Sequence, residues 1–208
     1  ANNSPTAHDQ QLPIWHMPHM RNPFFTGREH VLARLHQALH HEHAAVLSQS
    51  YALSGLGGIG KTQTALEYAH RYASDYTAIF WISAETTETL LASFTALAAV
   101  LDLPEKEEHE QKRVAAAVLR WLNSHDKWLL IFDNVEEVAL AQDFLPTAHT
   151  GSLLFTSRRQ ALGITAQTLD LEIMTSEESR RFLLHRARLL DPTATLAQLP
   201  PTDEAAVH

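Results

Sequence analysis

Hydrophobic and polar residues along this chain form two kinds of segment that alternate. Five short segments are rich in apolar residues, most fully residues 78–82 and 128–132, and the segments between them carry apolar residues at helical spacing. Short runs that are apolar on both faces are typical of strands in a parallel sheet covered by helices. The strand-like runs are residues 44–53, 78–82, 127–133, 151–156 and 166–171, and the helical patterns are residues 31–39, 65–72, 90–101, 114–122 and 182–190. The pattern therefore predicts an α/β domain.

The two ends of the chain differ from this central pattern. Residues 1–20 show no sustained period and are rich in polar residues and proline, so we predict a linker whose Trp15 packs on the domain. Residues 21–174 hold the alternating strands and helices. Thr175 to Glu178 have the spacing of a capping box, which marks the start of a helix. We expect residues 175–208 to be the start of a small helical domain, included only in part.

A glycine-rich segment lies between a predicted strand and a predicted helix. Residues 55–62 read Gly-Leu-Gly-Gly-Ile-Gly-Lys-Thr, with two glycines separated by four residues and followed by Lys61 and Thr62. Glycines let backbone N–H groups turn towards an anion, and the first helical turn adds unpaired donors. The segment predicts a nucleotide phosphate site, in which Lys61 reaches the β- and γ-phosphates and the Thr62 hydroxyl binds Mg²⁺.

Two later strands end in charged side chains. The apolar run 127–133 ends in Asp133, whose carboxylate we expect at the carboxyl edge of the sheet, where it would hold Mg²⁺ through water. An Asp in this place can also cap a helix. The run 151–156 is followed by Arg158, which would bind a γ-phosphate if its strand lies beside the phosphate-loop strand; otherwise it is a solvated loop residue.

Composition narrows the functional classes. The 208 residues are 45% hydrophobic and 19% charged, which is enough apolar material for a sizeable core. Because the formal net charge is −8 and Lys and Arg are dispersed, we expect no direct contact with nucleic acid. There are no cysteines, and no apolar run approaches the ~18 residues of a membrane span. These features favour a cytoplasmic protein without membrane contact.

Histidine is frequent, with 14 residues, and His40, His41 and His43 cluster after a predicted helix. A metal site and a solvated helix end are the two interpretations. We favour the helix end, where imidazoles meet terminal carbonyls, because no carboxylate or second histidine pair accompanies the cluster at ligand spacing.

The order of four motifs resembles the nucleotide-binding module of STAND-class P-loop ATPases, in the NB-ARC (AP-ATPase) branch that includes bacterial regulators. The motifs are Phe25-Thr26-Gly27-Arg28-Glu29, the loop 55–62, Asp133-Asn134 and Thr156-Ser157-Arg158. The resemblance covers about residues 21–190. It implies a three-layer αβα P-loop NTPase fold with a five-stranded parallel sheet of order 5-1-4-3-2, followed by an ARC1-like helical domain from Thr175.

The resemblance also implies site residues for ATP or ADP with Mg²⁺. Thr26 and Arg28 would lie near adenine and ribose, Thr62 and Asp133 at Mg²⁺, and Arg158 would sense the γ-phosphate. The residues expected around the phosphates are Gly57, Gly58, Ile59, Gly60, Lys61, Thr62 and Gln63. Lys61, Asp133, Asn134 and Arg158 would form the catalytic group. Many relatives carry an acid where Asn134 stands, so hydrolysis should be slow unless Glu136 or Glu137 substitutes.

Members of this family alternate between an ADP-bound closed state and an ATP-bound open state that oligomerises. The resemblance thus implies a molecular switch whose partners are effector and sensor domains outside this chain, with self-association on activation. The alternative is a turnover P-loop ATPase, either a motor or a kinase for a small acceptor, although no acceptor-binding signature is present. An interaction module with a vestigial loop is a third class, and intact Lys61, Thr62 and Asp133 argue against it.

Overall fold

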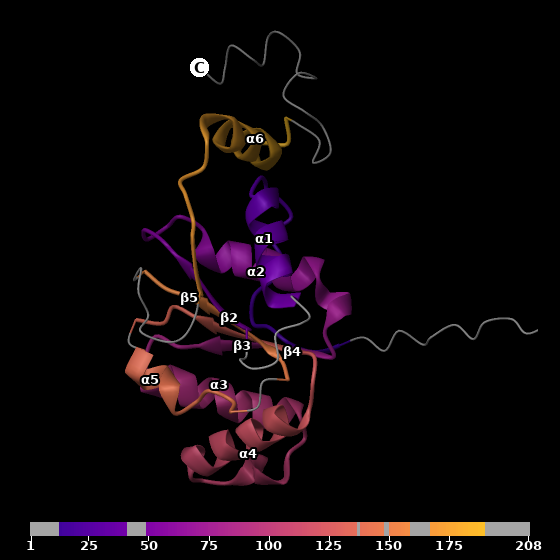
Figure 1. Cartoon of the computed structure of the whole chain (residues 1–208), viewed down its shortest axis with the longest axis vertical. Coiled ribbons are helices and arrows are strands. Elements are labelled where there is room, and N and C mark those ends of the chain that lie inside the picture. Colours follow the sequence, from indigo (N-terminus) through magenta and orange to yellow (C-terminus); the bar gives the residue numbers. More distant parts are fainter. Residues whose placement is uncertain (1–12, 41–48, 137, 148–149, 159–166, 190–208) are drawn as a thin grey trace, which may run out of the picture.

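The fold is built on one parallel sheet of six strands (Figure 1). The computed structural model describes residues 13–40, 49–136, 138–147, 150–158 and 167–189. The spatial order of the strands is β1-β3-β4-β5-β2-β6, and every neighbouring pair is parallel. The strands are β1 (Ile14–His16), β2 (Gln49–Ser54), β3 (Ala78–Ser83), β4 (Trp128–Asp133), β5 (Ser152–Thr156) and β6 (Gln167–Asp170).

Helices cover both faces of this sheet. In Figure 1, α1 and α2 lie on one side of the sheet, and α3, α4 and the short α5 lie on the other. Helix α6, the last helix of the described chain, lies near the top of the view, apart from the sheet. The helices are α1 (Glu29–His40), α2 (Lys61–Arg71), α3 (Thr87–Val100), α4 (Gln111–Ser124), α5 (Val138–Gln142) and α6 (Ser176–Arg186), with 3₁₀ turns η1 (Ala73–Asp75) and η2 (Pro104–Glu107). The result is the three-layer arrangement that the resemblance implies and an α/β domain as the alternating pattern predicts.

The central strands are buried on both faces because successive side chains enter two separate cores. In β3, Phe80 and Ile82 join the core under α3 and α4, whereas Ile79 and Trp81 join the core under α1 and α2. Strand β4 divides in the same way along its length. Each strand therefore had to be apolar throughout, which is the signal that the sequence carries.

The predicted strand order is confirmed, and the sheet has one strand more than expected. Without β1, the remaining strands read 5-1-4-3-2 in the numbering of the five apolar runs. Strand β1 lies inside the segment 1–20, for which a linker is predicted, and it pairs with β3 at the sheet edge. Trp15 on this strand packs on the core under α1 and α2, and its ring lies 4.8 Å from that of His70. Three residues are too short for any period to show, so the sequence could not reveal this strand.

Some expectations concern segments beyond the described residues. The strand-like run 44–53 is observed from Gln49 onwards, and residues 44–48 lie outside the described ranges. The division at residue 175 stays a prediction, although α6 does begin after Thr175 with a capping box formed with Glu178. No helix in the described part of the chain combines the length and the apolar character needed to cross a membrane.

The topology brings three strand ends to the same edge of the sheet. Strand β5 lies between β2, which leads into the glycine loop, and β4, which ends in Asp133. Backbone hydrogen bonds continue past the strands, from Ser157 N–H to the Leu53 carbonyl at 3.1 Å and from Val135 N–H to the Thr156 carbonyl at 2.9 Å. Residues that are about 70 to 100 positions apart in sequence thus meet at one edge.

We predict that Gly151→Ala destabilises the fold, because a Cβ at this position would overlap with the ring of buried Trp128. Overpacking of this kind costs about 1–3 kcal/mol of unfolding free energy. Denaturant unfolding would measure the loss. Gly57→Ala is the control, since its Cβ meets nothing within 4 Å. Equal stability of the two variants would show that the Trp128 ring moves aside freely.

Candidate functional site

The glycine loop joins the end of β2 to the start of α2. Gly58 and Gly60 have φ of 76° and 94°, a left-handed conformation that side chains with a Cβ adopt only at a cost. Gly60 precedes the first residue of α2, and nothing lies within 4 Å of a Cβ built on Gly57 or Gly58. The loop is therefore an open backbone turn at a helix N-terminus, which is the physical requirement for an anion cradle.

Lys61 is held inside this loop. Its ammonium donates hydrogen bonds to the carbonyls of Gly55 at 2.8 Å and Leu56 at 2.9 Å, and the residue is buried. Burial lowers the pKa of Lys61; nearby Arg158 lowers it further, and Asp133 raises it. The amine thus shares its surroundings with both charged residues predicted for the site.

Asp133 is connected to the start of α2 and to β5. One carboxylate oxygen, Oδ1, accepts hydrogen bonds from the hydroxyls of Thr62 at 2.9 Å and Thr156 at 2.5 Å. Asn134 follows with φ of 61°, and its N–H donates to the Thr156 hydroxyl at 2.9 Å. A hydroxyl and a carboxylate at one point are hard oxygen ligands, which fit Mg²⁺ better than they fit softer metals.

Arg158 lies at the open edge of the same region. It lines a hollow together with Gly55, Leu56 and Ile59 of the loop, and its side chain is 64% exposed. Its guanidinium lies 4.0 Å from the Glu136 carboxylate, which is itself half exposed. Arg158 is therefore placed beside the loop with a weak partner, as a residue free to turn towards a bound anion would be.

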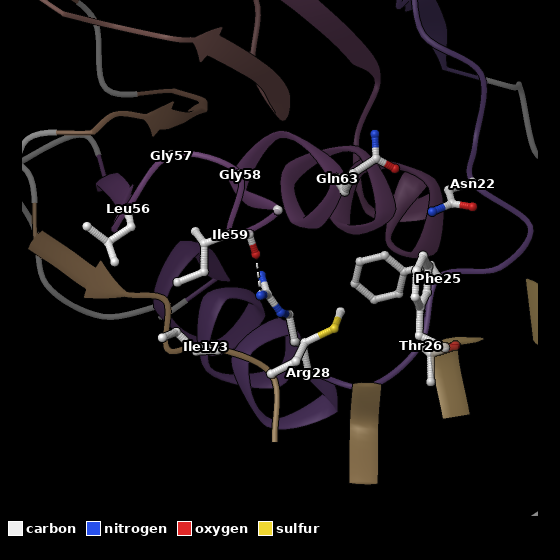
Figure 2. Close-up of a pocket in the computed structure, with 13 residues that line it drawn as sticks. Asn22, Phe25, Thr26, Arg28, Leu56, Gly57, Gly58, Ile59, Gln63 and Ile173 are labelled. Carbon is white, nitrogen blue, oxygen red and sulfur yellow. Dashed lines mark hydrogen bonds between the residues drawn. The ribbon is translucent and has the colours of Figure 1, made fainter. Parts of the chain in front are cut away.

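Arg28, which immediately precedes α1, forms hydrogen bonds with the glycine loop and with α2. Its guanidinium donates to the Thr64 hydroxyl at 3.0 Å and to the Ile59 carbonyl, the contact drawn as a dashed line in Figure 2. Arg28 is buried and has φ of 62°, and burial lowers its pKa while Glu178 raises it. The guanidinium binds the loop itself, and the residue forms one wall of the neighbouring pocket.

A pocket of about 520 Å³ lies between the glycine loop, the segment before α1 and the residues that precede α6 (Figure 2). Its volume is within the range of small-molecule sites, and its walls are mainly apolar. Seven predicted site residues line it: Thr26, Arg28, Gly57, Gly58, Ile59, Gly60 and Gln63. Lys61, Thr62, Asp133, Asn134 and Arg158 are not among its lining residues, and their contacts place them at the adjoining sheet edge.

Sequence reasoning missed the apolar walls of this pocket. The additional lining residues are Asn22, Phe25, Leu56, Ile173, Met174 and Phe182. Ile173 and Met174 form an apolar pair between β6 and α6, and Ile173 is 75% exposed. An apolar pair in a connecting segment is the one signal that could have indicated them, because such residues are costly to expose without a ligand or partner.

Helix α6 contacts the residues that open α1. The Glu178 carboxylate accepts hydrogen bonds from the N–H groups of Arg28 at 3.2 Å and Thr175 at 2.9 Å. These bonds, first that from Thr175, hold the pKa of Glu178 below its usual value. His185 lies with Nδ1 3.0 Å from the Thr26 hydroxyl, which also contacts the Phe24 carbonyl at 3.0 Å. The helix is thereby joined to one wall of the pocket.

Similar solved structures share this fold. The chain resembles the crystal structure of Cdc6p from Pyrobaculum aerophilum at 16% identity with a TM-score of 0.54, over 89% of this chain and 52% of that one. It also resembles the Aeropyrum pernix ORC2 protein, described as ADPNP and ADP complexes, at 16% identity with a TM-score of 0.51, over 78% of this chain and 53% of that one. At such identities the likeness concerns the fold, a P-loop ATPase α/β fold.

Sequence relatives are longer proteins. A nucleotide-binding leucine-rich repeat (NLR)-like protein of Hyaloscypha variabilis is 30% identical in an alignment of 162 residues that covers 68% of this chain and 16% of the relative. The regulatory protein AfsR of Streptomyces griseus is 29% identical over 166 residues, 76% of this chain and 17% of AfsR. The chain thus spans about a sixth of the length of these relatives. Residues 28–188 match the NB-ARC domain, and because this match covers most of the sequence, the chain belongs to the NB-ARC family.

Proposed function

We propose that this chain is the ATP/ADP-binding switch module of a STAND-class signal-transduction ATPase. One observation carries the proposal: the glycine loop, the Thr62 and Asp133 pair and helix α6 all converge on one site. The glycine loop and the Thr62 and Asp133 pair supply groups that bind a polyphosphate and its cation. Helix α6 can change its position in response to the bound nucleotide.

Three sources of positive electrostatic potential surround the proposed phosphate position. The open loop and the N-terminus of α2 offer backbone N–H groups, Lys61 offers an ammonium, and Arg158 offers a guanidinium within electrostatic reach of Lys61. When bound, Mg²⁺ would neutralise phosphate charge, and Thr62 and Asp133 are the residues that would hold it. Lys61 now donates to two loop carbonyls, so it can exchange these for phosphate oxygens with little movement.

The apolar pocket suits the nucleoside part. Phe25, Met174 and Phe182 line it, and a purine ring buries well against aromatic and thioether side chains. The same pocket contains Thr26 and Arg28, which the NB-ARC resemblance assigns to the adenine and ribose region. We infer that ATP or ADP places its base here and its phosphates at the loop.

Arg28 connects the bound nucleotide to α6. Its side chain holds the Ile59 carbonyl in the loop, and its backbone N–H binds Glu178 on α6. A change in the loop on binding a γ-phosphate can therefore alter the packing of α6. Such a device switches only if ATP and ADP bind its two states with different affinities, because equal affinity shifts no population.

The site lacks a carboxylate at the position where a general base for ATP hydrolysis is expected. Asn134 follows the Asp133 strand end and cannot accept a proton from water at neutral pH. Glu136 is the described acid near this position, and it faces Arg158 at 4.0 Å. We infer slow hydrolysis, which suits a switch better than the turnover ATPase that is the alternative.

The partners of the module are inferred from the family. Since the matched segment is only 16–17% of the length of each relative, we propose that effector and sensor domains of the same protein act with it, and that the ATP state self-associates. Nothing among the described residues identifies those domains. Nucleotide binding is the property that can be tested on this chain directly.

We predict that Lys61→Ala lowers the affinity for both ATP and ADP by at least about 100-fold, because it removes a buried cation from the phosphate site. Isothermal titration calorimetry with Mg²⁺ present would measure this. Lys106→Ala is the matched control, since Lys106 is a surface residue paired with Asp102. Unchanged affinities in Lys61→Ala would refute the phosphate-loop assignment.

We predict that Arg158→Ala weakens ATP about 10- to 100-fold more than ADP, the size of one lost charge-assisted hydrogen bond to a γ-phosphate. Competition binding with a fluorescent nucleotide would give both affinities. Arg113→Ala on the surface of α4 is the control. Equal losses for ATP and ADP would remove the sensing role of Arg158 while leaving the nucleotide site intact.

We predict a turnover well below one per minute, with a rise of about tenfold or more in Asn134→Asp, because a carboxylate can act as a general base. Asp tolerates the left-handed φ of 61° at this position better than Glu does. A steady-state phosphate-release assay would measure both chains. Rapid multiple turnover in the unaltered chain would favour the motor or kinase alternative.

A further inference from the structure

A second group of ligand-type side chains lies at the other end of α1. His36 and His40 are one helical turn apart on α1, and Asp75 approaches them from η1. His36 Nδ1 and His40 Nε2 each lie 3.8 Å from the same carboxylate oxygen, Oδ2 of Asp75. Within the described ranges, this is a set in which all three ligand atoms lie within 4.8 Å of one another.

Both imidazoles are held in orientation by their neighbours. The His36 ring stacks on Tyr72 at 4.0 Å between centroids with an interplanar angle of 9°. The His40 ring meets Tyr76 edge-on at 5.3 Å, and its Nδ1 lies 3.2 Å from the His36 carbonyl. Because that carbonyl can only accept, His40 Nδ1 is the donor in this contact, and Nε2 is the His40 nitrogen that lies on the Asp75 side.

The ring nitrogen of His36 that faces Asp75, Nδ1, has no hydrogen-bond partner. This atom is buried from solvent, and a buried polar atom without a hydrogen bond destabilises the fold unless a ligand satisfies it. It points into the same space as His40 Nε2 and the Asp75 oxygen. A histidine that donates its second N–H to a backbone carbonyl, as His40 does, is also the usual arrangement of a metal ligand.

We propose that His36, His40 and Asp75 bind a divalent transition-metal ion of the zinc type. Two imidazole nitrogens and one carboxylate oxygen suit Zn²⁺, Co²⁺, Ni²⁺ or Cu²⁺, whereas Mg²⁺ and Ca²⁺ require oxygen ligands. Three protein ligands leave the fourth tetrahedral position to water. The proposal thus names a second, chemically distinct cation site, which neither the nucleotide nor its Mg²⁺ would occupy.

The geometry needs a small contraction to bind the ion. Zinc–ligand bonds of ~2.0 Å place tetrahedral ligand atoms ~3.3 Å apart, against the present 3.8 Å between each nitrogen and the carboxylate oxygen. Rotation of the Asp75 side chain, which is 36% exposed, can shorten these two distances. The two ring nitrogens, which lie within 4.8 Å of each other, would approach by small rotations of the imidazoles. Burial, and then the neighbouring His40, lower the pKa of His36, while Asp75 raises it.

The site would tie two parts of the fold together at a distance from the nucleotide. Helix α1 has 12 residues, so its histidine end lies roughly 12–18 Å along the axis from Arg28. Turn η1 joins α2 to β3, and a shared ion would fasten it to α1. Metal binding is therefore expected to stabilise the chain without changing its affinity for nucleotide.

This cluster is not evident from spacing in the sequence. The histidines that are close in sequence are His40, His41 and His43, and the latter two lie outside the described residues, whereas His36 stands one helical turn before His40. The carboxylate comes from a residue 35 positions further along the chain. Only the packing of η1 against α1 brings it into place.

The test is calorimetric titration of the metal-free chain with ZnCl₂ at neutral pH. We expect one Zn²⁺ per chain with micromolar or tighter affinity, and a rise in Tm of several degrees at saturating zinc. His40→Ala and Asp75→Asn should each weaken binding at least tenfold. Substituted Co²⁺ should show visible absorption of a tetrahedral site, and both variants should lose it.

Three control chains make the result specific. His109→Ala removes an exposed histidine elsewhere, and the double variant His41→Ala/His43→Ala removes the adjacent pair. Lys61→Ala, the third control, impairs the phosphate loop and leaves the histidines intact. All three control chains should bind zinc as tightly as the unaltered chain does. Circular dichroism without metal would verify that each chain folds. Equal zinc affinity in His40→Ala, Asp75→Asn and the unaltered chain, or loss of binding in the His41/His43 variant alone, would overturn the proposal.

Discussion

The hydrogen bonds that Asp133 accepts from Thr62 and Thr156 are the connection on which the site depends. They join the start of α2 to the ends of β4 and β5 through one carboxylate oxygen. These groups can meet because all six strands are parallel, so that their carboxyl ends share one edge. The parallel order in turn requires strands buried on both faces, and the two cores above and below β3 and β4 supply that burial.

Arg28 extends this arrangement to α6. A buried guanidinium must find hydrogen-bond acceptors, and here the acceptors are the Ile59 carbonyl and the Thr64 hydroxyl, next to the first turn of α2. Its backbone N–H is satisfied by Glu178. The glycine loop, the segment before α1 and α6 therefore cannot move independently without leaving a buried polar group unpaired. In the proposed switch, this coupling would transmit a change in the loop to α6.

The two ends of α1 carry different chemistry. Its N-terminal end adjoins the apolar pocket, which Thr26 and Arg28 line just before the helix, and its C-terminal end presents His36 and His40 to Asp75. Oxygen ligands at the sheet edge suit a hard cation, and imidazoles at the far end suit a softer one. A chain with both sites would keep its structural ion separate from the ion that accompanies nucleotide.

The amino-acid sequence by itself determined the fold class, the strand order through its resemblance to a known family, and the positions of the glycine loop and of Asp133. Those signals are local, since a strand buried on both faces and a glycine turn each need particular residue types at consecutive positions. The tertiary structure alone decided three features: strand β1, the apolar pocket walls at Ile173 and Met174, and the meeting of Asp75 with His36 and His40. Each of these depends on a short segment packing against a distant one, and contacts between distant segments leave no period in the sequence.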